Sequence, residues 1–296
     1  MKLRDYEILY DLPAGEYAET EIGGIRTKTI RAGDTLEVEC FPITRVSAAA
    51  KQEAQRRRSS PAQQKLNQRN RQRRMARLID ANFTRADYVL TGTYETPGAE
   101  YGMANLDDLR AEYDALHAPW EMDRARRDVV NFVQRVRRME ARNGGDPKAV
   151  MHLYVIEGGK EPRRGLPPKY HFHMVVHAPH LTADMIKSLW PFGFTQCDRL
   201  DLEHGGAERL SKYLTKQLRY ERCWGHSRNL KEPTVTVSDR KVSRRRAALV
   251  ARDVLQYGRQ ILEKIYPGYR CEAEPEVKFS DFVAGAYMYV RMRRRR

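Results

Sequence analysis

The spacing of apolar and polar residues predicts a β-hairpin near the start of the chain. Residues 25–30 (IRTKTI) and 35–40 (TLEVEC) each alternate between apolar and polar side chains, and a short turn sequence at 31–34 (RAGD) separates them. We therefore expect residues 1–47 to form a small β-rich lead. Arginine, glutamine and asparagine dominate the next segment, 48–83, so we expect it to be helical in its second half and partly disordered when free.

Residues 84–222 contain the densest pattern of predicted elements. Short alternating or continuous apolar runs predict strands, and apolar residues at helical spacing predict helices. In chain order these are a strand at 88–94, a helix at 123–142, strands at 151–156 and 170–177, a short helix capped by Thr182, a strand at 194–200 and a helix at 207–220. The order β-α-β-β-α-β is that of the split βαβ, ferredoxin-like or RRM-like arrangement. It predicts an α+β fold with an antiparallel sheet and helices on one face.

The charge of the chain favours a polyanionic partner. Lysine and arginine number 54 against 39 acidic residues, which gives a formal net charge of +15. Nucleic acid is the first candidate for such a partner.

The last segment, 223–296, is predicted to be a basic extension with one helix at 242–265. Clustered arginines in the basic segment are candidate phosphate contacts, although they could also be solvated: Arg56, Arg57, Arg58, Arg73 and Arg74.

Neither a membrane segment nor a secretory signal is evident in the sequence. No apolar run approaches the ~20 residues that span a bilayer, and the first residues lack an uninterrupted apolar stretch. The four cysteines lie far apart without paired spacing, which fits free thiols in a reducing compartment. We therefore expect a cytoplasmic protein that does not act at a membrane.

Two histidines on one predicted strand are the strongest candidates for chemistry. Residues i and i+2 of a strand point to the same face, so His171 and His173 lie side by side while Phe172 and Met174 turn into the core. Glu157 ends the preceding strand, and it comes within reach of both imidazoles if the two strands are hairpin neighbours. Two nitrogens and one carboxylate suit Mn²⁺ or Mg²⁺ in a Lewis-acid role.

A tyrosine on the helix at 207–220 is the candidate nucleophile. Tyr213 and Lys216 are three residues apart, so they share a helical face. A phenol with a pKa near 10 is only about 0.1% ionised at neutral pH, so it needs a cation nearby to become competent. Lys216 could lower the pKa of the phenol or neutralise a phosphate, and both roles stay open. Tyr220, two turns further along the same face, is the reserve nucleophile.

Three motifs together resemble those of a known enzyme family. They are Thr91-Gly-Thr-Tyr94, His171-Phe-His173 and Tyr213-Leu-Thr-Lys216, in that order. Their order is similar to that of the His-hydrophobic-His (HUH) endonucleases, specifically the rolling-circle replication initiator (Rep) proteins of plasmids and single-stranded DNA phages. The resemblance covers about residues 84–222. It implies that Glu157, His171 and His173 hold the cation. It also implies that Tyr213 attacks a DNA phosphate, leaving a 5′-phosphotyrosine link and a free 3′-hydroxyl.

The same resemblance carries further expectations. Arg209 stands four positions before Tyr213, where some relatives have a second tyrosine, so a single-tyrosine enzyme is expected. The chain has no Gly-x-x-x-x-Gly-Lys-Ser/Thr loop, which implies that a separate helicase unwinds the DNA. The substrate would be single-stranded or locally melted DNA at an origin, in the cytoplasm of a bacterial host. Residues bordering the site are candidate DNA contacts: Thr91, Thr93 and Tyr220.

Two alternatives remain open at the level of sequence. The first is a relaxase or transposase of the same superfamily, which would use the same chemistry at a different DNA site. The second is a non-catalytic nucleic-acid-binding module. In that case Tyr88, Tyr94 and Tyr154 could stack nucleobases on the sheet, as aromatic residues of RNA-binding sheets do.

Overall fold

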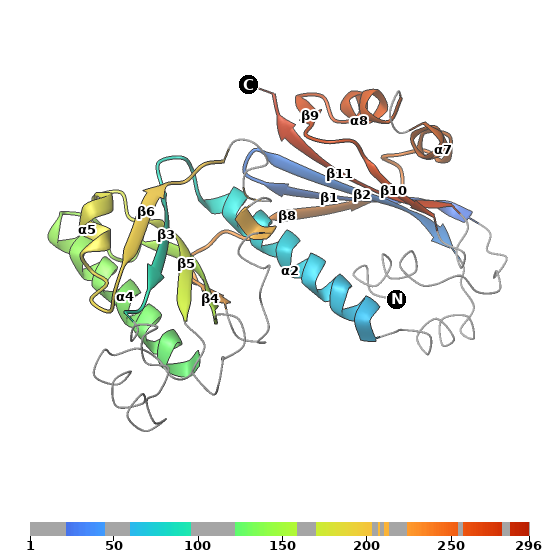
Figure 1. Ribbon diagram of the computed structural model, residues 1–296. Coiled ribbons are helices and arrows are strands. Elements are labelled where there is room, and N and C mark those ends of the chain that lie inside the picture. Colours follow the sequence, from blue (N-terminus) through green and yellow to red (C-terminus); the bar gives the residue numbers. More distant parts are fainter. Residues whose placement is uncertain are drawn as a thin grey trace. The chain divides into compact units, whose positions relative to one another are not determined.

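The computed structural model divides the chain into two compact units, one formed by residues 1–81 and 232–296 and the other by residues 82–231. Figure 1 shows the elements of both. The structure describes residues 22–44, 60–95, 122–158, 170–202, 207, 210–212, 224–253, 257–279 and 285–295.

The unit of residues 82–231 has the predicted ferredoxin-like order. Its elements are β3 (Tyr88–Thr93), α4 (Met122–Arg142), β4 (Met151–Glu157), β5 (His171–His177), α5 (Ala183–Lys187), β6 (Thr195–Arg199) and an additional short strand, β7 (Trp224–His226). The sheet order is β6-β3-β5-β4-β7, and every neighbouring pair is antiparallel. The predicted α+β class with a split antiparallel sheet is therefore confirmed.

One face of this sheet carries the hydrophobic core. Residues of α4 such as Phe132 pack on Phe172 and Met174 of β5, which are fully buried. The N-cap predicted at Thr182 is present, because its side chain accepts a hydrogen bond from the backbone N–H of Met185. Gly92 lies opposite Phe172 in the sheet, and a Cβ at this position would come within 2.2 Å of the Phe172 ring. The glycine of the Thr91-Gly-Thr motif thus makes room for the core aromatic residue.

The second unit contains a six-stranded antiparallel sheet. The predicted hairpin is confirmed as β1 (Ile22–Ala32) and β2 (Thr35–Thr44), which turn at Gly33 with φ +57°. The remaining strands come from the far end of the chain: β8 (Thr234–Ser238), β9 (Tyr269–Cys271), β10 (Glu276–Phe279) and β11 (Ala286–Arg294). β11 pairs with β2 and β8 pairs with β1, so the two ends of the chain share one sheet.

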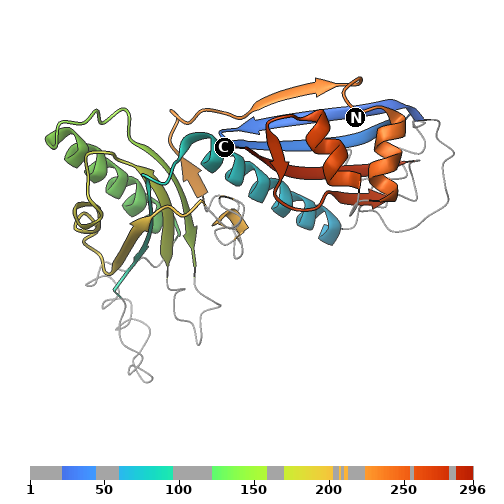
Figure 2. The same cartoon turned by 90° about the horizontal axis from the view of Figure 1, so that it is seen from above.

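Helices cover both faces of this six-stranded sheet, as the two views together show (Figure 1 and Figure 2). The helix predicted in the second half of the basic segment is α2 (Ser60–Asn82), and its Arg77 pairs with Glu37 of β2 at 2.5 Å. Asp80 of α2 pairs likewise with Arg291 of β11 at 2.5 Å. On the opposite face, α7 (Arg244–Arg252) and α8 (Arg259–Ile265) pack against apolar residues of β2 and β11.

The prediction of one helix at 242–265 in a separate C-terminal extension was wrong. Asp253 has φ −140° and ψ 82°, so α7 ends there, and a second helix starts at Arg259. Four strands of the six-stranded sheet also lie in residues 223–296. The apolar spacing of the two short helices is continuous in sequence, and it therefore gave no sign of the break.

Two predictions about the chain as a whole can be compared with the described residues. Among them, no helix is both long and apolar enough to cross a membrane. Cys40, Cys197 and Cys271 are buried free thiols, as expected, whereas Cys223 lies outside the described residues.

Candidate metal centre

The candidate metal site lies on the face of the β3–β7 sheet opposite its helix-packed core. β4 and β5 are hairpin neighbours, as predicted, and their register sets Glu157 opposite His171 and Val155 opposite His173. Because Phe172 points into the core, the alternation of β5 turns both histidines to the other face. The three predicted ligands therefore meet at adjoining strand positions.

The donor atoms of these three residues form a compact group. One nitrogen from each of His171 and His173 and one oxygen of Glu157 all lie within 4.8 Å of one another. The His171 Nε2 atom is 3.4 Å from Glu157 Oε2. The two imidazole rings are 5.1 Å apart between centroids and nearly perpendicular, at 89°. Within the described residues, this is the group of histidine, cysteine and acidic side chains that could hold a metal ion.

The protonation state of His173 suits metal ligation. His173 is 4% exposed, and its pKa is lowered to about 4, chiefly by burial and to a smaller extent by His171, against an opposing effect of Glu157. A metal ligand must be a neutral imidazole, and this residue is neutral at physiological pH.

Glu157 supplies the test of whether a cation fits. Its side chain is buried, and its Oε1 atom accepts no hydrogen bond from any described residue. A buried carboxylate is costly unless it is paired or coordinates a metal. Two imidazole nitrogens and one carboxylate oxygen, all within 4.8 Å of one another, therefore fit a divalent cation.

Thr91 holds one of the two imidazoles in place. It lies opposite His173 in the β3–β5 pairing, and its Oγ1 atom is 2.8 Å from His173 Nδ1. A hydrogen bond at Nδ1 fixes the ring and directs Nε2 toward the other ligands, as outer partners of metal-bound histidines commonly do. Thr93, on the same face, instead donates to the carbonyl of Phe194 at 3.2 Å. DNA contact by these two threonines stays a prediction.

A further histidine of β5, His177, has a structural role. It shares the strand face of the metal site, but its Nδ1 atom lies 2.6 Å from the buried Asp87. Asp87 also accepts a hydrogen bond from the backbone of Thr84, so it closes the turn that leads into β3. The pair of His177 and Asp87 therefore fixes the turn before β3 against the end of β5.

The predicted nucleophile lies outside the described residues. Tyr213, Lys216 and Tyr220 fall there, as does the arginine run at 56–58, so their predicted roles stay predictions. The described positions of the predicted helix, 207 and 210–212, are helical.

Of the five arginines predicted as phosphate contacts, Arg73 and Arg74 are described, and both already have partners within their own unit. Arg73 lies over the ring of Tyr289 at 3.8 Å, and its side chain is 11% exposed. Arg74 is more accessible and pairs with Glu232 at 3.2 Å. Their contact with DNA stays a prediction, and Arg74 is the better placed of the two.

The sheet tyrosines cannot serve as stacking platforms. Tyr88, Tyr94 and Tyr154 all belong to the hydrophobic core on the helix side of the sheet and are at most 7% exposed. The hydroxyl of Tyr88 donates to the carbonyl of Leu181, and that of Tyr94 donates to Asp128. The base-stacking arrangement considered for a non-catalytic module is therefore wrong.

Comparison with known proteins associates this unit with replication. Searches among curated proteins and among solved structures give no match. Residues 87–218, however, match the model of a family described as replication-associated proteins. The matched stretch includes β3, all three candidate metal ligands and Tyr213. The part of the chain that carries the candidate metal centre is thus similar to replication-associated proteins.

Proposed function

We propose that this chain is a replication-initiating DNA endonuclease of the HUH, rolling-circle type, which nicks single-stranded DNA at an origin and rejoins strands. The observation that carries the proposal is the cluster of Glu157, His171 and His173 within the stretch that matches a replication-associated family. The net charge of +15 supports a nucleic acid as substrate.

Each residue of the cluster has a defined task in this proposal. Glu157, His171 and His173 would hold Mn²⁺ or Mg²⁺, and Thr91 would orient the His173 ring through its 2.8 Å contact. When bound, the cation would act as a Lewis acid toward a non-bridging phosphate oxygen. His173 and Glu157 are both buried, so little water would reach the cation from the side of the sheet.

The covalent step would use Tyr213 as nucleophile. Its phenol oxygen forms a bond to phosphorus as the bond between phosphorus and the 3′ oxygen breaks. The phenol proton is lost, and the 3′ oxygen gains a proton to become a free hydroxyl. Rejoining reverses these bonds, with a 3′-hydroxyl attacking the phosphotyrosine. Lys216, on the same helical face, would lower the pKa of the phenol or offset phosphate charge.

Substitution of the tyrosines tests this assignment. Tyr213→Phe should abolish the covalent adduct with an origin oligonucleotide in the presence of Mn²⁺ while leaving oligonucleotide binding nearly intact. Tyr220→Phe, which removes the reserve phenol, is the matched control and should retain the adduct. Undiminished cleavage by Tyr213→Phe would refute the role of this residue.

The position of the nick distinguishes the proposed initiator from a relaxase or a transposase. The initiator should nick within a replication origin, whereas a relaxase nicks at a transfer origin and a transposase at the end of its element. Sequencing the 5′ ends of the covalently attached DNA would map the site directly.

A further inference from the structure

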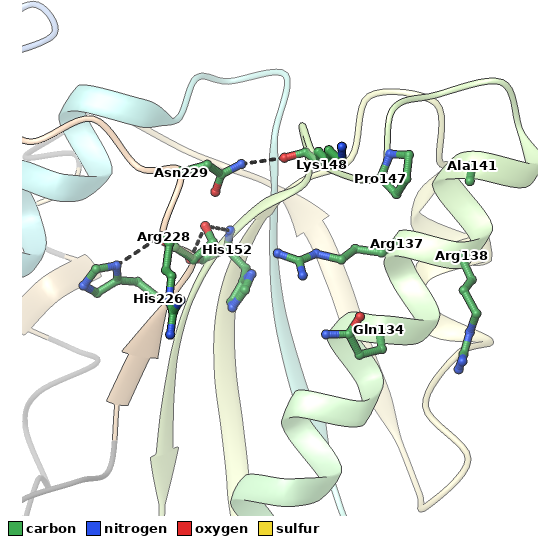
Figure 3. A pocket seen from close by; sticks show the side chains of 11 residues that line it. Gln134, Arg137, Arg138, Ala141, Pro147, Lys148, His152, His226, Arg228 and Asn229 are labelled. Atoms are coloured by element: carbon green, nitrogen blue, oxygen red, sulfur yellow. Dashed lines mark hydrogen bonds between the residues drawn. The ribbon is translucent and has the colours of Figure 1, made fainter.

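A cavity of about 850 Å³ lies at one edge of the unit that carries the metal centre (Figure 3). It is bounded by α4, by the start of β4 and by the residues that follow β7. None of its lining residues is acidic, and four are basic: Arg137, Arg138, Lys148 and Arg228. The composition of the lining therefore favours an anionic ligand.

Hydrogen bonds fix the wall opposite α4. The backbone N–H of His152 donates to Ser227 Oγ at 3.0 Å, and the backbone N–H of Ser227 donates to the carbonyl of His152 at 2.9 Å. Asn229 donates through Nδ2 to the carbonyl of Lys148 at 2.9 Å. Residues that are distant in sequence are thus tied together, and the cavity is a built feature of the fold.

Two buried polar atoms in the cavity lack hydrogen-bond partners in the part of the chain that the structure describes. The Nε atom of Arg137 and the Nδ1 atom of His152 are buried, and neither makes a hydrogen bond to a described residue. Figure 3 shows Arg137 extending from α4 toward His152. A buried donor of an arginine is normally satisfied, because its desolvation is costly. An external acceptor would satisfy the Nε–H of Arg137, and also the Nδ1 atom of His152 when that nitrogen carries the ring proton.

The remaining cations of the cavity are also available to a ligand. Within the described part of the chain, Arg138, Lys148 and Arg228 form no ion pair. The pKa of His152 is lowered to about 4, chiefly by burial and to a smaller extent by the nearby Arg137 and His226. The cavity thus has an excess of positive charge, and this charge repels a metal ion and attracts an anion.

The cavity is separate from the metal centre. His152 and Glu157 are five residues apart on β4, which corresponds to roughly 17 Å along a strand. His152 also points to the helix side of the sheet, whereas Glu157 points to the opposite side.

We propose that this cavity binds a backbone phosphate of a nucleic acid strand, at a position remote from the scissile phosphate. Arginine is well suited to this task because its planar guanidinium can donate two parallel hydrogen bonds to one phosphate. The choice of a nucleic acid over another phosphate compound rests on the proposed function. Contact with a remote phosphate would hold the strand in register while the metal centre acts.

The salt dependence of binding tests the proposal. Arg138 and Arg228 are exposed, so Arg138→Gln with Arg228→Gln should fold normally, and circular dichroism checks this. Arg127→Gln is the control, since this arginine is exposed on the same helix but outside the cavity. All variants are made in a His173→Ala background, so that binding is measured without cleavage. The fluorescence anisotropy of a labelled single-stranded oligonucleotide then gives affinity as a function of salt.

The proposal predicts a smaller salt slope for the double variant. The loss of one phosphate contact reduces the slope of log affinity against log salt by about 0.7 for a single strand. Between about 50 and 200 mM salt the wild-type protein then loses roughly 2.6-fold more affinity than the double variant. The control should keep the wild-type slope.

Two outcomes would overturn the proposal. Equal slopes for the double variant and the Arg127→Gln control would show that the cavity makes no special contact. An unchanged slope, together with a melting temperature that inorganic phosphate raises only when the cavity is intact, would assign the cavity to a free phosphate compound. If the double variant shows the expected smaller slope but the wild-type protein nicks no DNA, the proposed endonuclease function is rejected. The proposed phosphate-binding site is then still supported.

Discussion

Removing the hydroxyl of Thr91 should weaken metal binding without disturbing the metal ligands. Thr91→Val keeps the shape of the side chain and deletes the atom that lies 2.8 Å from His173 Nδ1. Water cannot replace this hydroxyl, because His173 is only 4% exposed. The variant therefore leaves a buried ring nitrogen without the partner that orients it.

The size of the effect follows from this loss. An unsatisfied buried polar group costs about 1–3 kcal/mol. A metal held through Nε2 requires the proton on Nδ1, so the full cost falls on the metal-bound state. Loss of an outer partner of a ligating histidine typically reduces affinity by about 10–100-fold. We expect a reduction in this range for Mn²⁺.

Isothermal titration with Mn²⁺ measures this change directly, and it does not depend on enzymatic activity. Thr93→Val is the matched control, because Thr93 lies on the same strand and face but bonds to the carbonyl of Phe194. This control should bind Mn²⁺ like the wild type. Equal weakening in both variants, or wild-type affinity in Thr91→Val, would refute the positioning role of Thr91.

Two further predictions concern stability. Alanine at Gly92 places its Cβ 2.2 Å from the Phe172 ring, and such overpacking should cost about 1–3 kcal/mol in urea unfolding, whereas Gly24→Ala, whose nearest contact is 3.5 Å, should cost less. His152 and His173 have pKa values of about 4 when folded and near 6.5 when unfolded, so the unfolded state binds more protons between these values. With chelator present, the free energy of unfolding should therefore fall as pH drops from about 6.5 toward 4, by about 1.4 kcal/mol per pH unit for each histidine. His152→Asn should remove one of the two contributions, and an unchanged pH dependence in that variant would contradict the assignment.

The sequence allowed the ferredoxin-like core and the three candidate metal ligands to be predicted because both depend on local patterns. The alternation of β5 alone divides Phe172 from His171 and His173 between the two faces of the sheet. The loop between β4 and β5 joins neighbouring antiparallel strands, and so Glu157 had to come near the histidines. The two-residue period of the strands and the order of the elements along the chain were sufficient to predict both the core and the metal ligands.

Features that depend on pairing between distant segments were not predicted. The contact of Thr91 with His173 requires the register of β3 against β5, which no local pattern encodes. The same register turns Tyr88 into the core, and the register of β4 against β5 does so for Tyr154. The final strand, β11, looked like part of a basic tail, yet Arg291 is buried there because Asp80 and Glu37 neutralise it.

The basic cavity was missed for a related reason. Its cations come from α4, from the turn before β4 and from the residues after β7. In a sequence with 54 basic residues, no single one of these stands out. Only the fold brings them together and leaves the Nε atom of Arg137 without an internal partner among the described residues.

The central claim is that a metal held by Glu157, His171 and His173 supports covalent attack of Tyr213 on DNA. Incubation with a single-stranded origin oligonucleotide and Mn²⁺, followed by peptide mass spectrometry, tests it most directly. We predict a DNA adduct on Tyr213 that carries the 5′ phosphate of the downstream fragment. This adduct should disappear with a chelator and in the His171→Ala, His173→Ala double variant. An adduct of equal yield without metal, or a nick without any covalent intermediate, would contradict the account.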